Sequence, residues 1–286
     1  MTVLRRAPLL FYCGWSQSVR CPTAGVVPLV DEHKHLRGGY ESSARFYDLF
    51  AENDDIPFYT ELAMQYGSPV LDLAAGTGRV AIPLVRAGFE VTALEKSQSM
   101  LSVLRSKRES LPTNSRERLQ VIEGDMTSFH LGQRFSLILI PASFGHAMTT
   151  DEQLSLLSCV REHLRPEGIF VLDLFPGGAM PEHAVFEEGP VTLSDGTKVY
   201  RHGVIDCDLV RQILTLRETF TVVPPGRQKP EGTTIEVVSG AAILFNREVD
   251  LLIRMSRLRV RGEYGGFDGR PYTSECGRRI LLLAPK

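Results

Sequence analysis

The sequence predicts an α/β protein with a doubly wound, seven-stranded sheet and an inserted antiparallel β-sheet. Three observations support this fold class. Between residues 68 and 175, short apolar runs alternate with helix-like periodicity, as in a doubly wound sheet. After Pro176-Gly177-Gly178 the pattern changes to β-rich stretches separated by turn residues. Near the C-terminus, a helix over 247–258 and strands over 260–264 and 279–283 complete the first sheet with an antiparallel edge pair.

The first segment, residues 1–37, differs in composition from the rest of the chain. Three arginines precede its first acidic residue, Asp31. We expect a flexible tail, with an arginine-rich organellar transit peptide as the alternative. The apolar stretch Ala7–Trp15 is too short to span a bilayer, and no other run reaches the roughly 20 residues needed.

Residues 39–66 carry aromatic side chains at helical spacing, which predicts a helical lid or a pair of N-terminal helices. These aromatic residues are Phe46, Tyr47, Phe50, Phe58 and Tyr59. Aromatic residues on one helix face usually pack in a core. We therefore expect a core role and a functional role for Tyr47 equally.

The first predicted strand, Val70–Leu73, is followed by Gly76 and Gly78 and by a helix over 79–87. The glycines let the backbone turn tightly and approach a ligand, and the start of the helix exposes a row of N–H groups. The segment also fits the pattern Gly-x-Gly-x-x-Gly/Ala, so a dinucleotide-binding site is the alternative. Asp72 argues against that alternative, because its carboxylate repels a pyrophosphate but suits a ligand with an ammonium and a sulfonium.

Further helices are predicted over 97–108 and 151–163, with Ser97 and Thr150 as their N-caps. His163 is expected to face solvent from the second of these helices, and His183 to lie in the loop after the fifth strand.

The order hydrophobic-hydrophobic-Asp-hydrophobic-x-x-Gly-x-Gly resembles motif I of the class I S-adenosylmethionine-dependent methyltransferases. The segments Val91–Glu95, Val121–Met126, Phe135–Ile140 and Leu164–Asp173 resemble later strands of that family, in the family's order. The resemblance implies a Rossmann-like methyltransferase fold, S-adenosylmethionine as the cofactor and S-adenosylhomocysteine as the product. The cofactor-binding residues that it implies are Asp72, Ala74, Gly76, Gly78, Glu95, Lys96, Asp125, Met126 and Pro141.

The resemblance implies a separate role for each acidic residue at the ends of these strands. Glu95, nineteen residues after Gly76, would accept hydrogen bonds from the ribose hydroxyls. Asp125 would meet the adenine amino group, and Met126 would pack on the ring. Each acid taken singly is more often a helix cap or a turn residue. Together with Asp72, however, they end three successive strands at the edge where open α/β sheets bind ligands.

The loop after the fourth strand holds the candidate acceptor chemistry. Pro141–His146 resembles the Ser-x-Gly-His segment of bacterial deoxyamino-sugar N,N-dimethyltransferases, which also share the Tyr-Asp-Leu-Phe stretch that begins at Tyr47 and a β insertion. This resemblance runs from about Tyr47 to the end of the chain. Phe267–Pro271 departs from it and looks like the ending of other methyltransferases of this architecture.

His146 and Tyr47 are the candidate catalytic residues. A sulfonium methyl is already electrophilic, so the protein mainly has to hold a nucleophile close and in line. An amine acceptor must lose its proton, and His146 is the only side chain of this loop that accepts one near neutral pH. The alternative is that His146 only hydrogen-bonds substrate or backbone. Tyr47 would orient the amine lone pair.

The charge and composition of the chain argue against nucleic acid and membranes as partners. A formal net charge of -2 gives no global attraction to nucleic acid or to an anionic membrane. A nucleic-acid base methyltransferase would also carry Asn/Asp-Pro-Pro-Tyr/Phe where this chain has Ile140-Pro141-Ala142-Ser143. The five cysteines lack metal or disulfide spacing, which predicts no metal site and a cytoplasmic protein.

We therefore predict an enzyme that methylates an amine of a small molecule, an amino sugar or similar. The alternatives are a small-molecule O-methyltransferase, an NAD-binding oxidoreductase and a non-catalytic S-adenosylmethionine-binding protein. The predicted organisation is a cofactor domain over 38–175, a β insertion over 176–245 and a return to the first domain over 246–286. The insertion caps the acceptor pocket or forms the interface of a homodimer.

Overall fold

The computed structural model describes Leu36 and residues 40–286. The tail predicted over residues 1–37 lies outside the described residues, except for Leu36. Contacts divide the chain into residues 1–32 and residues 33–286, and all the structure described below belongs to the second unit.

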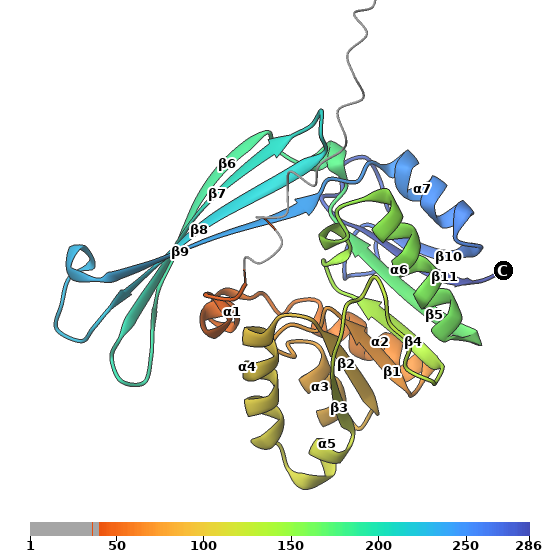
Figure 1. Ribbon diagram of the computed structural model, residues 1–286, viewed down its shortest axis with the longest axis horizontal. Coiled ribbons are helices and arrows are strands. Elements are labelled where there is room, and N and C mark those ends of the chain that lie inside the picture. The colour runs from red at the N-terminus through yellow and green to blue at the C-terminus, as the bar shows by residue number, and fades with distance from the viewer. Residues whose placement is uncertain (1–35, 37–39) are drawn as a thin grey trace, which may run out of the picture. The chain divides into compact units, whose positions relative to one another are not determined.

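The first sheet has seven strands in the order β10-β11-β5-β4-β1-β2-β3 (Figure 1). The neighbours among β1 to β5 pair in parallel, whereas β11 pairs antiparallel with both β5 and β10. The predicted fold class, with its antiparallel edge, is confirmed. All residues of β1 and β4 are buried, as in strands covered on both faces. The strands are β1 (Val70–Leu73), β2 (Val91–Glu95), β3 (Leu119–Glu123), β4 (Phe135–Ile140), β5 (Leu164–Leu174), β10 (Leu258–Tyr264) and β11 (Arg279–Pro285).

Helices cover both faces of this sheet, and successive residues of β1 face opposite layers. Val70 belongs to a core cluster with side chains of α2, α3 and α4, whereas Leu71 and Leu73 pack with α6 and α7. Asp72 therefore points to the same side as Val70. The helices are α1 (Ala44–Phe50), α2 (Ile56–Tyr66), α3 (Ala81–Arg86), α4 (Gln98–Glu109), α5 (Thr113–Glu117), α6 (Thr150–His163) and α7 (Asn246–Met255).

Two local predictions about these helices need correction. Ser97 caps α4 as predicted, but the N-cap of α6 is Thr149, because the Thr149 hydroxyl accepts a hydrogen bond from the Glu152 N–H. The prediction that His163 faces solvent is wrong, since this side chain is only 2% exposed. Its ring bonds to the Leu131 N–H and the Cys159 carbonyl, which satisfies both nitrogens.

The inserted strands form a separate antiparallel sheet in the order β6-β7-β8-β9. Its first strand begins at His183, earlier than the predicted start at Pro190, and includes His183 rather than leaving it in a loop. The other three strands lie where turn residues predicted them. Their bounds are β6 (His183–Thr192), β7 (Lys198–Asp208), β8 (Ile213–Val223) and β9 (Thr233–Ala242).

The second sheet packs against α1. The Phe46 ring of α1 stacks on the Phe220 ring of β8, with centroids 5.1 Å apart. These two residues form a small core cluster with Val199 and Val237. The aromatic spacing of residues 46–50 thus serves, in part, the packing of α1 on the inserted sheet.

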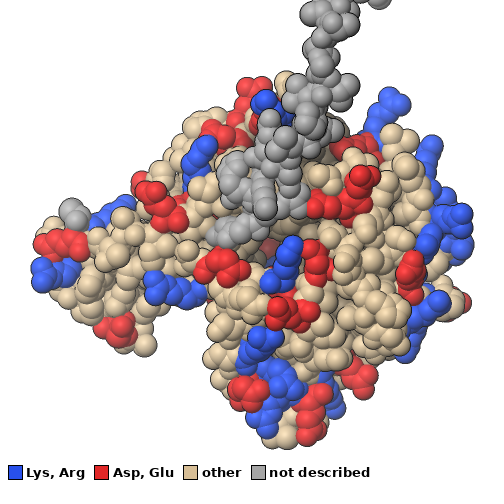
Figure 2. Space-filling view, viewed as in Figure 1, with Lys and Arg blue, Asp and Glu red and all other residues tan. Residues whose placement is uncertain are grey.

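On the face shown in Figure 2, acidic and basic side chains are interspersed over most of the surface. None of the described helices is long and apolar enough to cross a membrane. Within residues 40–286, no group of three or more His, Cys, Asp or Glu side chains is arranged to hold a metal ion.

Candidate active site

The loop after β1 is shaped by its two glycines. Both have positive φ angles, 58° at Gly76 and 81° at Gly78. A Cβ at Gly78 would lie 2.4 Å from Cδ1 of Leu104 in α4, whereas a Cβ at Gly76 would meet nothing within 4 Å. Gly78 therefore allows close packing of the loop on α4, and Gly76 leaves open space above the loop.

A cavity of about 310 Å³, which we call the first cavity, lies at the C-terminal ends of β1, β2 and β3. This is the edge at which open α/β sheets bind ligands. Eight of the residues predicted for the site line it: Tyr47, Ala74, Gly76, Glu95, Lys96, Asp125, Met126 and His146. The other three, Asp72, Gly78 and Pro141, do not line this cavity.

The acids of β2 and of the loop after β3 are held in place by the protein itself. The Glu95 carboxylate accepts hydrogen bonds from the N–H groups of Gly76, Lys96 and Ser97, at 2.7–2.8 Å. Asp125 accepts from Lys96 Nζ at 2.7 Å and from Thr127, which lowers its pKa despite partial burial. Both carboxylates are thus oriented by the protein before any ligand binds.

Asp72 lies behind the loop rather than in the cavity wall. It is 1% exposed, and neither of its carboxylate oxygens has a hydrogen-bond partner among the described residues. Burial raises its pKa to about 7, and the nearby Arg79 guanidinium offsets this only in part. Burying an ionised carboxylate without a partner costs free energy, so an ionised Asp72 needs a compensating positive charge nearby.

His146 follows β4 in a short 3-10 turn, η2 (Phe144–His146). Its Nδ1 lies 3.3 Å from the Gly240 carbonyl oxygen of β9, and its Nε2 lies 3.4 Å from the Tyr40 hydroxyl. Because a carbonyl only accepts, we assign the proton to Nδ1, which leaves a lone pair on Nε2. Burial lowers the pKa of His146, so the ring is neutral at pH 7.

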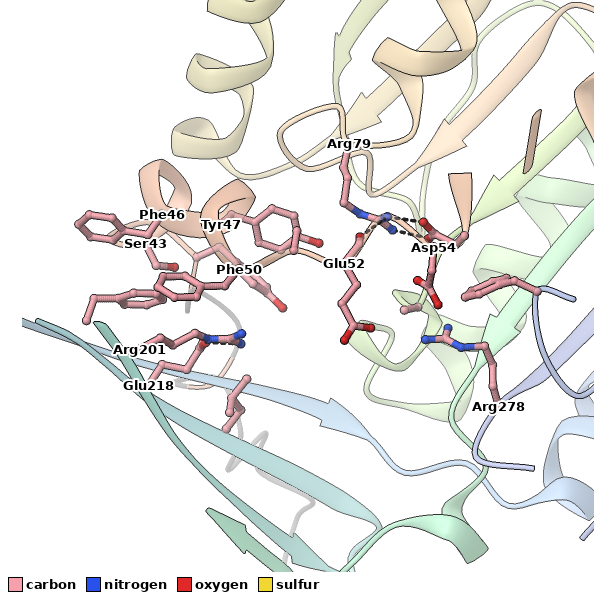
Figure 3. A pocket seen from close by; sticks show the side chains of 17 residues that line it. Ser43, Phe46, Tyr47, Phe50, Glu52, Asp54, Arg79, Arg201, Glu218 and Arg278 are labelled. Atoms are coloured by element: carbon pink, nitrogen blue, oxygen red, sulfur yellow. Dashed lines mark hydrogen bonds and ion pairs between the residues drawn. The ribbon is translucent and has the colours of Figure 1, made fainter. Parts of the chain in front are cut away.

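A second cavity, of about 230 Å³, lies between α1, residues 51–55 and strands β7 and β8 (Figure 3). Tyr40 and Tyr47 line both cavities, and their rings meet edge to face with centroids 6.4 Å apart. The two tyrosines therefore form the boundary between the cavities. His146 lies against this boundary, with its ring centroid 5.6 Å from that of Tyr40.

The fold brings together several charged residues that the sequence did not point to. Arg201 of β7 pairs with Glu218 of β8, and Arg278 pairs with the buried Asp173 of β5. Asp173 also accepts hydrogen bonds from the Tyr59 hydroxyl and the Ala142 N–H, so it anchors the loop that leads to His146. Only the alternation of β7 and β8 could have hinted at Arg201 and Glu218, and no local signal marks Tyr40.

Comparisons with known proteins agree with this geometry. Residues 70–168 match the family model described as a methyltransferase domain. The dTDP-3-amino-3,4,6-trideoxy-alpha-D-glucopyranose N,N-dimethyltransferase of Streptomyces venezuelae is 28% identical over 246 residues, covering 79% of this chain and 94% of that protein. The solved structure of the CcbJ methyltransferase from Streptomyces caelestis has 23% identity and a TM-score of 0.71, covering 87% and 98% of the two chains. The glycopeptide N-methyltransferase MtfA, complexed with S-adenosyl-L-homocysteine, is 26% identical with a TM-score of 0.57, covering 84% and 91%.

Residues 70–168 thus form a methyltransferase domain, as the motif order predicted, and the chain has the fold of solved methyltransferases. One of these similar structures is complexed with S-adenosyl-L-homocysteine, the product expected from the predicted cofactor. The match favours this class over the dinucleotide-binding alternative.

Proposed function

We propose that this methyltransferase moves a methyl group from S-adenosylmethionine to the amine nitrogen of a small molecule, an amino sugar or a similar amine. The observation that carries the proposal is a neutral histidine whose unprotonated Nε2 faces the Tyr40 hydroxyl at the boundary of two cavities. The similar proteins reported above include two whose names specify methylation at nitrogen.

The residues of the first cavity suit this cofactor. Behind the loop, Asp72 has two unpartnered oxygens, and an ammonium or sulfonium in the cavity would favour its ionised form. The open space above Gly76 admits a close approach to the backbone, and the fixed Glu95 carboxylate keeps a free acceptor position for hydroxyls. Lys96 and Asp125 pair with each other at the end of the cavity that Met126 lines. When bound, S-adenosylmethionine supplies an electrophilic methyl group.

The protein's own residues would hold and deprotonate the acceptor. An amine that enters from the second cavity meets Tyr40 and Tyr47 at the boundary. Because the Tyr40 hydroxyl donates to Nε2 of His146, a proton from the ammonium reaches Nε2 directly or through that hydroxyl. The Gly240 carbonyl accepts from Nδ1 and so stabilises the imidazolium that forms. The amine keeps its lone pair for the new bond.

The test is S-adenosylhomocysteine release from a panel of acceptors that differ only in the nucleophile. Each amine is paired with the alcohol of the same carbon frame, and methylated products are identified by mass spectrometry. Methylation of amines alone supports the proposal, whereas methylation of alcohols alone would establish an O-methyltransferase. Binding of S-adenosylhomocysteine without any turnover would indicate a non-catalytic binding protein. The cytoplasmic location and a homodimer stay predictions.

A further inference from the structure

Arg79 links the glycine loop to the segment between α1 and α2. Its guanidinium makes a bidentate pair with Asp55, at 2.5 and 2.6 Å, and donates to the Glu52 carbonyl oxygen at 2.9 Å. The Arg79 side chain is 14% exposed and the Asp55 side chain 6%, so the pair is held in one geometry. Arg79 is therefore a fixed positive charge in the wall of the second cavity.

The same guanidinium lies beside the Tyr47 hydroxyl. Figure 3 shows the Tyr47 ring extending from α1 toward the Arg79 side chain. Burial raises the pKa of Tyr47, and the charge and hydrogen bonding of Arg79 offset only part of this rise, so the hydroxyl stays protonated at neutral pH. A guanidinium only donates hydrogen bonds, so it attracts the hydroxyl oxygen and turns the hydroxyl proton away from itself.

The proton of the Tyr47 hydroxyl is open to a ligand. Tyr40 and Tyr47 both line the two cavities, but the Tyr40 hydroxyl lies 3.4 Å from Nε2 of His146, to which it donates. The Tyr47 hydroxyl, in contrast, donates to no side chain or carbonyl in the part of the chain that the structure describes. Of the two hydroxyls at the boundary, one is thus committed to His146 and the other is available to the acceptor.

The reactive amine itself is a poor partner for this proton. An amine that accepts a hydrogen bond from Tyr47 has its lone pair occupied, whereas the new bond to the methyl carbon needs that lone pair. An oxygen on the neighbouring carbon of the acceptor accepts the hydrogen bond without this cost. Donation by Tyr47 therefore favours a contact beside the amine over the role expected from the sequence, in which Tyr47 acts on the amine lone pair.

We infer that Arg79 is a positioning residue that acts through Tyr47, and that the Tyr47 hydroxyl donates to an oxygen beside the reactive amine of the acceptor. The preferred acceptors are therefore amines with a hydroxyl on the neighbouring carbon. The rings of Phe46, Phe50 and Phe220 supply an apolar wall for the carbon frame. The inference rests on the proposed amine methylation and names the substrate feature that the second cavity recognises.

The experiment compares two acceptors on one ring frame, trans-2-aminocyclohexanol and cyclohexylamine, which differ only in the neighbouring hydroxyl. We measure kcat/KM for each with saturating S-adenosylmethionine, and we titrate each into the complex of the full chain with S-adenosylhomocysteine. The readout is the preference ratio, defined as the value for the amino alcohol divided by the value for the amine. Because the two amines differ in basicity, this ratio is compared between variants, where that difference cancels.

Matched variants test the two steps of the inference. Tyr47→Phe should lower the preference ratio by about 10-fold, the upper range for one hydrogen bond between neutral groups. Arg79→Gln should lower it several-fold, and Arg79→Lys, which keeps a cation, should restore part of it. In the Tyr47→Phe background, Arg79→Gln should lower the ratio no further, since Arg79 acts through the hydroxyl. Arg86→Gln is the control, because Arg86 is an exposed arginine of α3 that lines neither cavity.

The preference ratio separates positioning from structural support. If Arg79 only supports the cavity wall through Asp55, its loss weakens both acceptors alike and leaves the ratio unchanged. An unchanged ratio in Tyr47→Phe or in Arg79→Gln would therefore overturn the inference, even if amines are methylated. An equal effect of Arg79→Gln with and without the Tyr47 hydroxyl would also overturn it.

Titration separates this inference from the proposed function, because it gives the preference ratio without turnover. Binding of S-adenosylhomocysteine also shows that each variant is folded. If the amino alcohol binds better through Tyr47 and Arg79 but no amine is methylated, the proposed function fails and the inferred hydrogen bond stands.

Discussion

At the scale of single residues, His146 shows how tertiary contacts tune an ordinary side chain. Its Nδ1 is tied to the Gly240 carbonyl and its Nε2 faces the Tyr40 hydroxyl. Burial lowers the pKa of His146 below its usual value near 6.5, so protonation at rest is suppressed. The ring is thereby kept ready to accept a proton at neutral pH.

Substitution of His146 tests this role. We expect His146→Gln to lower kcat for an amine acceptor by roughly 100-fold, the lower end of what a general base contributes. The affinity for S-adenosylhomocysteine should change little. The kcat of the native protein should stay high as pH falls to 6.5 and decline only below it, because the neutral form persists to lower pH. An unchanged kcat in the variant would remove His146 from the reaction.

Asp72 makes a prediction about stability. Its pKa is raised from 3.8 to about 7 by burial, so the folded state holds the proton more tightly than the unfolded state. Its contribution to stability is therefore full below the unfolded pKa and is lost as pH rises to about 7. The loss is on the order of 4 kcal/mol at one pKa unit per 1.36 kcal/mol.

Asp72→Asn cannot titrate and should not show this loss. In cofactor-free protein, the free energy of unfolding of the variant should gain on that of the native chain as pH rises from 4 to 7.5. Urea unfolding at several pH values measures the difference. Parallel pH profiles would mean that Asp72 is not an uncompensated buried acid.

At the scale of elements, α1 lies beside both cavities and is held there by side-chain contacts. Asp48 of α1 accepts a hydrogen bond from the Thr77 hydroxyl at 2.7 Å and pairs with Lys107 of α4 at 2.6 Å. Arg79, two residues after Thr77, holds Asp55 and the Glu52 carbonyl. Residues of the glycine loop thus anchor the helix and the segment that cover it.

Removing one of these anchors should loosen α1. Thr77→Val keeps the shape of a fully buried side chain but removes the hydrogen bond to Asp48. We expect faster hydrogen exchange over residues 40–50 and faster release of S-adenosylhomocysteine, by several-fold. Thr60→Val is the control, because it removes a hydroxyl that bonds only to Ile56 within α2. Equal exchange in both variants would argue against the anchor.

At the scale of the whole described unit, the second cavity exists only because two sheets meet around α1. Strands β7 and β8 of the second sheet supply Arg201, Leu216 and Glu218, whereas loops of the first sheet supply Arg79 and Arg278. Gly145 lets the loop after β4 lie against β9, where a Cβ would come within 2.9 Å of the Ala242 carbonyl oxygen. The insertion thus forms one wall of the cavity.

Filling that cavity from the second sheet should affect the acceptor alone. Leu216→Trp places a large ring in the lining, so we expect KM for the acceptor to rise at least 10-fold while cofactor affinity stays unchanged. Val210→Trp is the control, because Val210 is 95% exposed in the turn between β7 and β8. A similar loss in both variants would show that the wall is not part of the acceptor site.

The sequence by itself determined the first sheet, its order of elements and the edge at which ligands bind. Glycines after a buried strand and acids at strand ends are local signals, because the chain must turn and place ligand groups within a few residues. The N-cap Ser97 was predicted on the same local grounds. The other N-cap was predicted at Thr150, one residue too late, because two adjacent threonines can cap the same helix. The second cavity could be found only in the tertiary structure. Tyr40, Arg201 and Arg278 are distant in sequence, and each pairs with groups that only folding brings near, as the unexpected burial of His163 also shows.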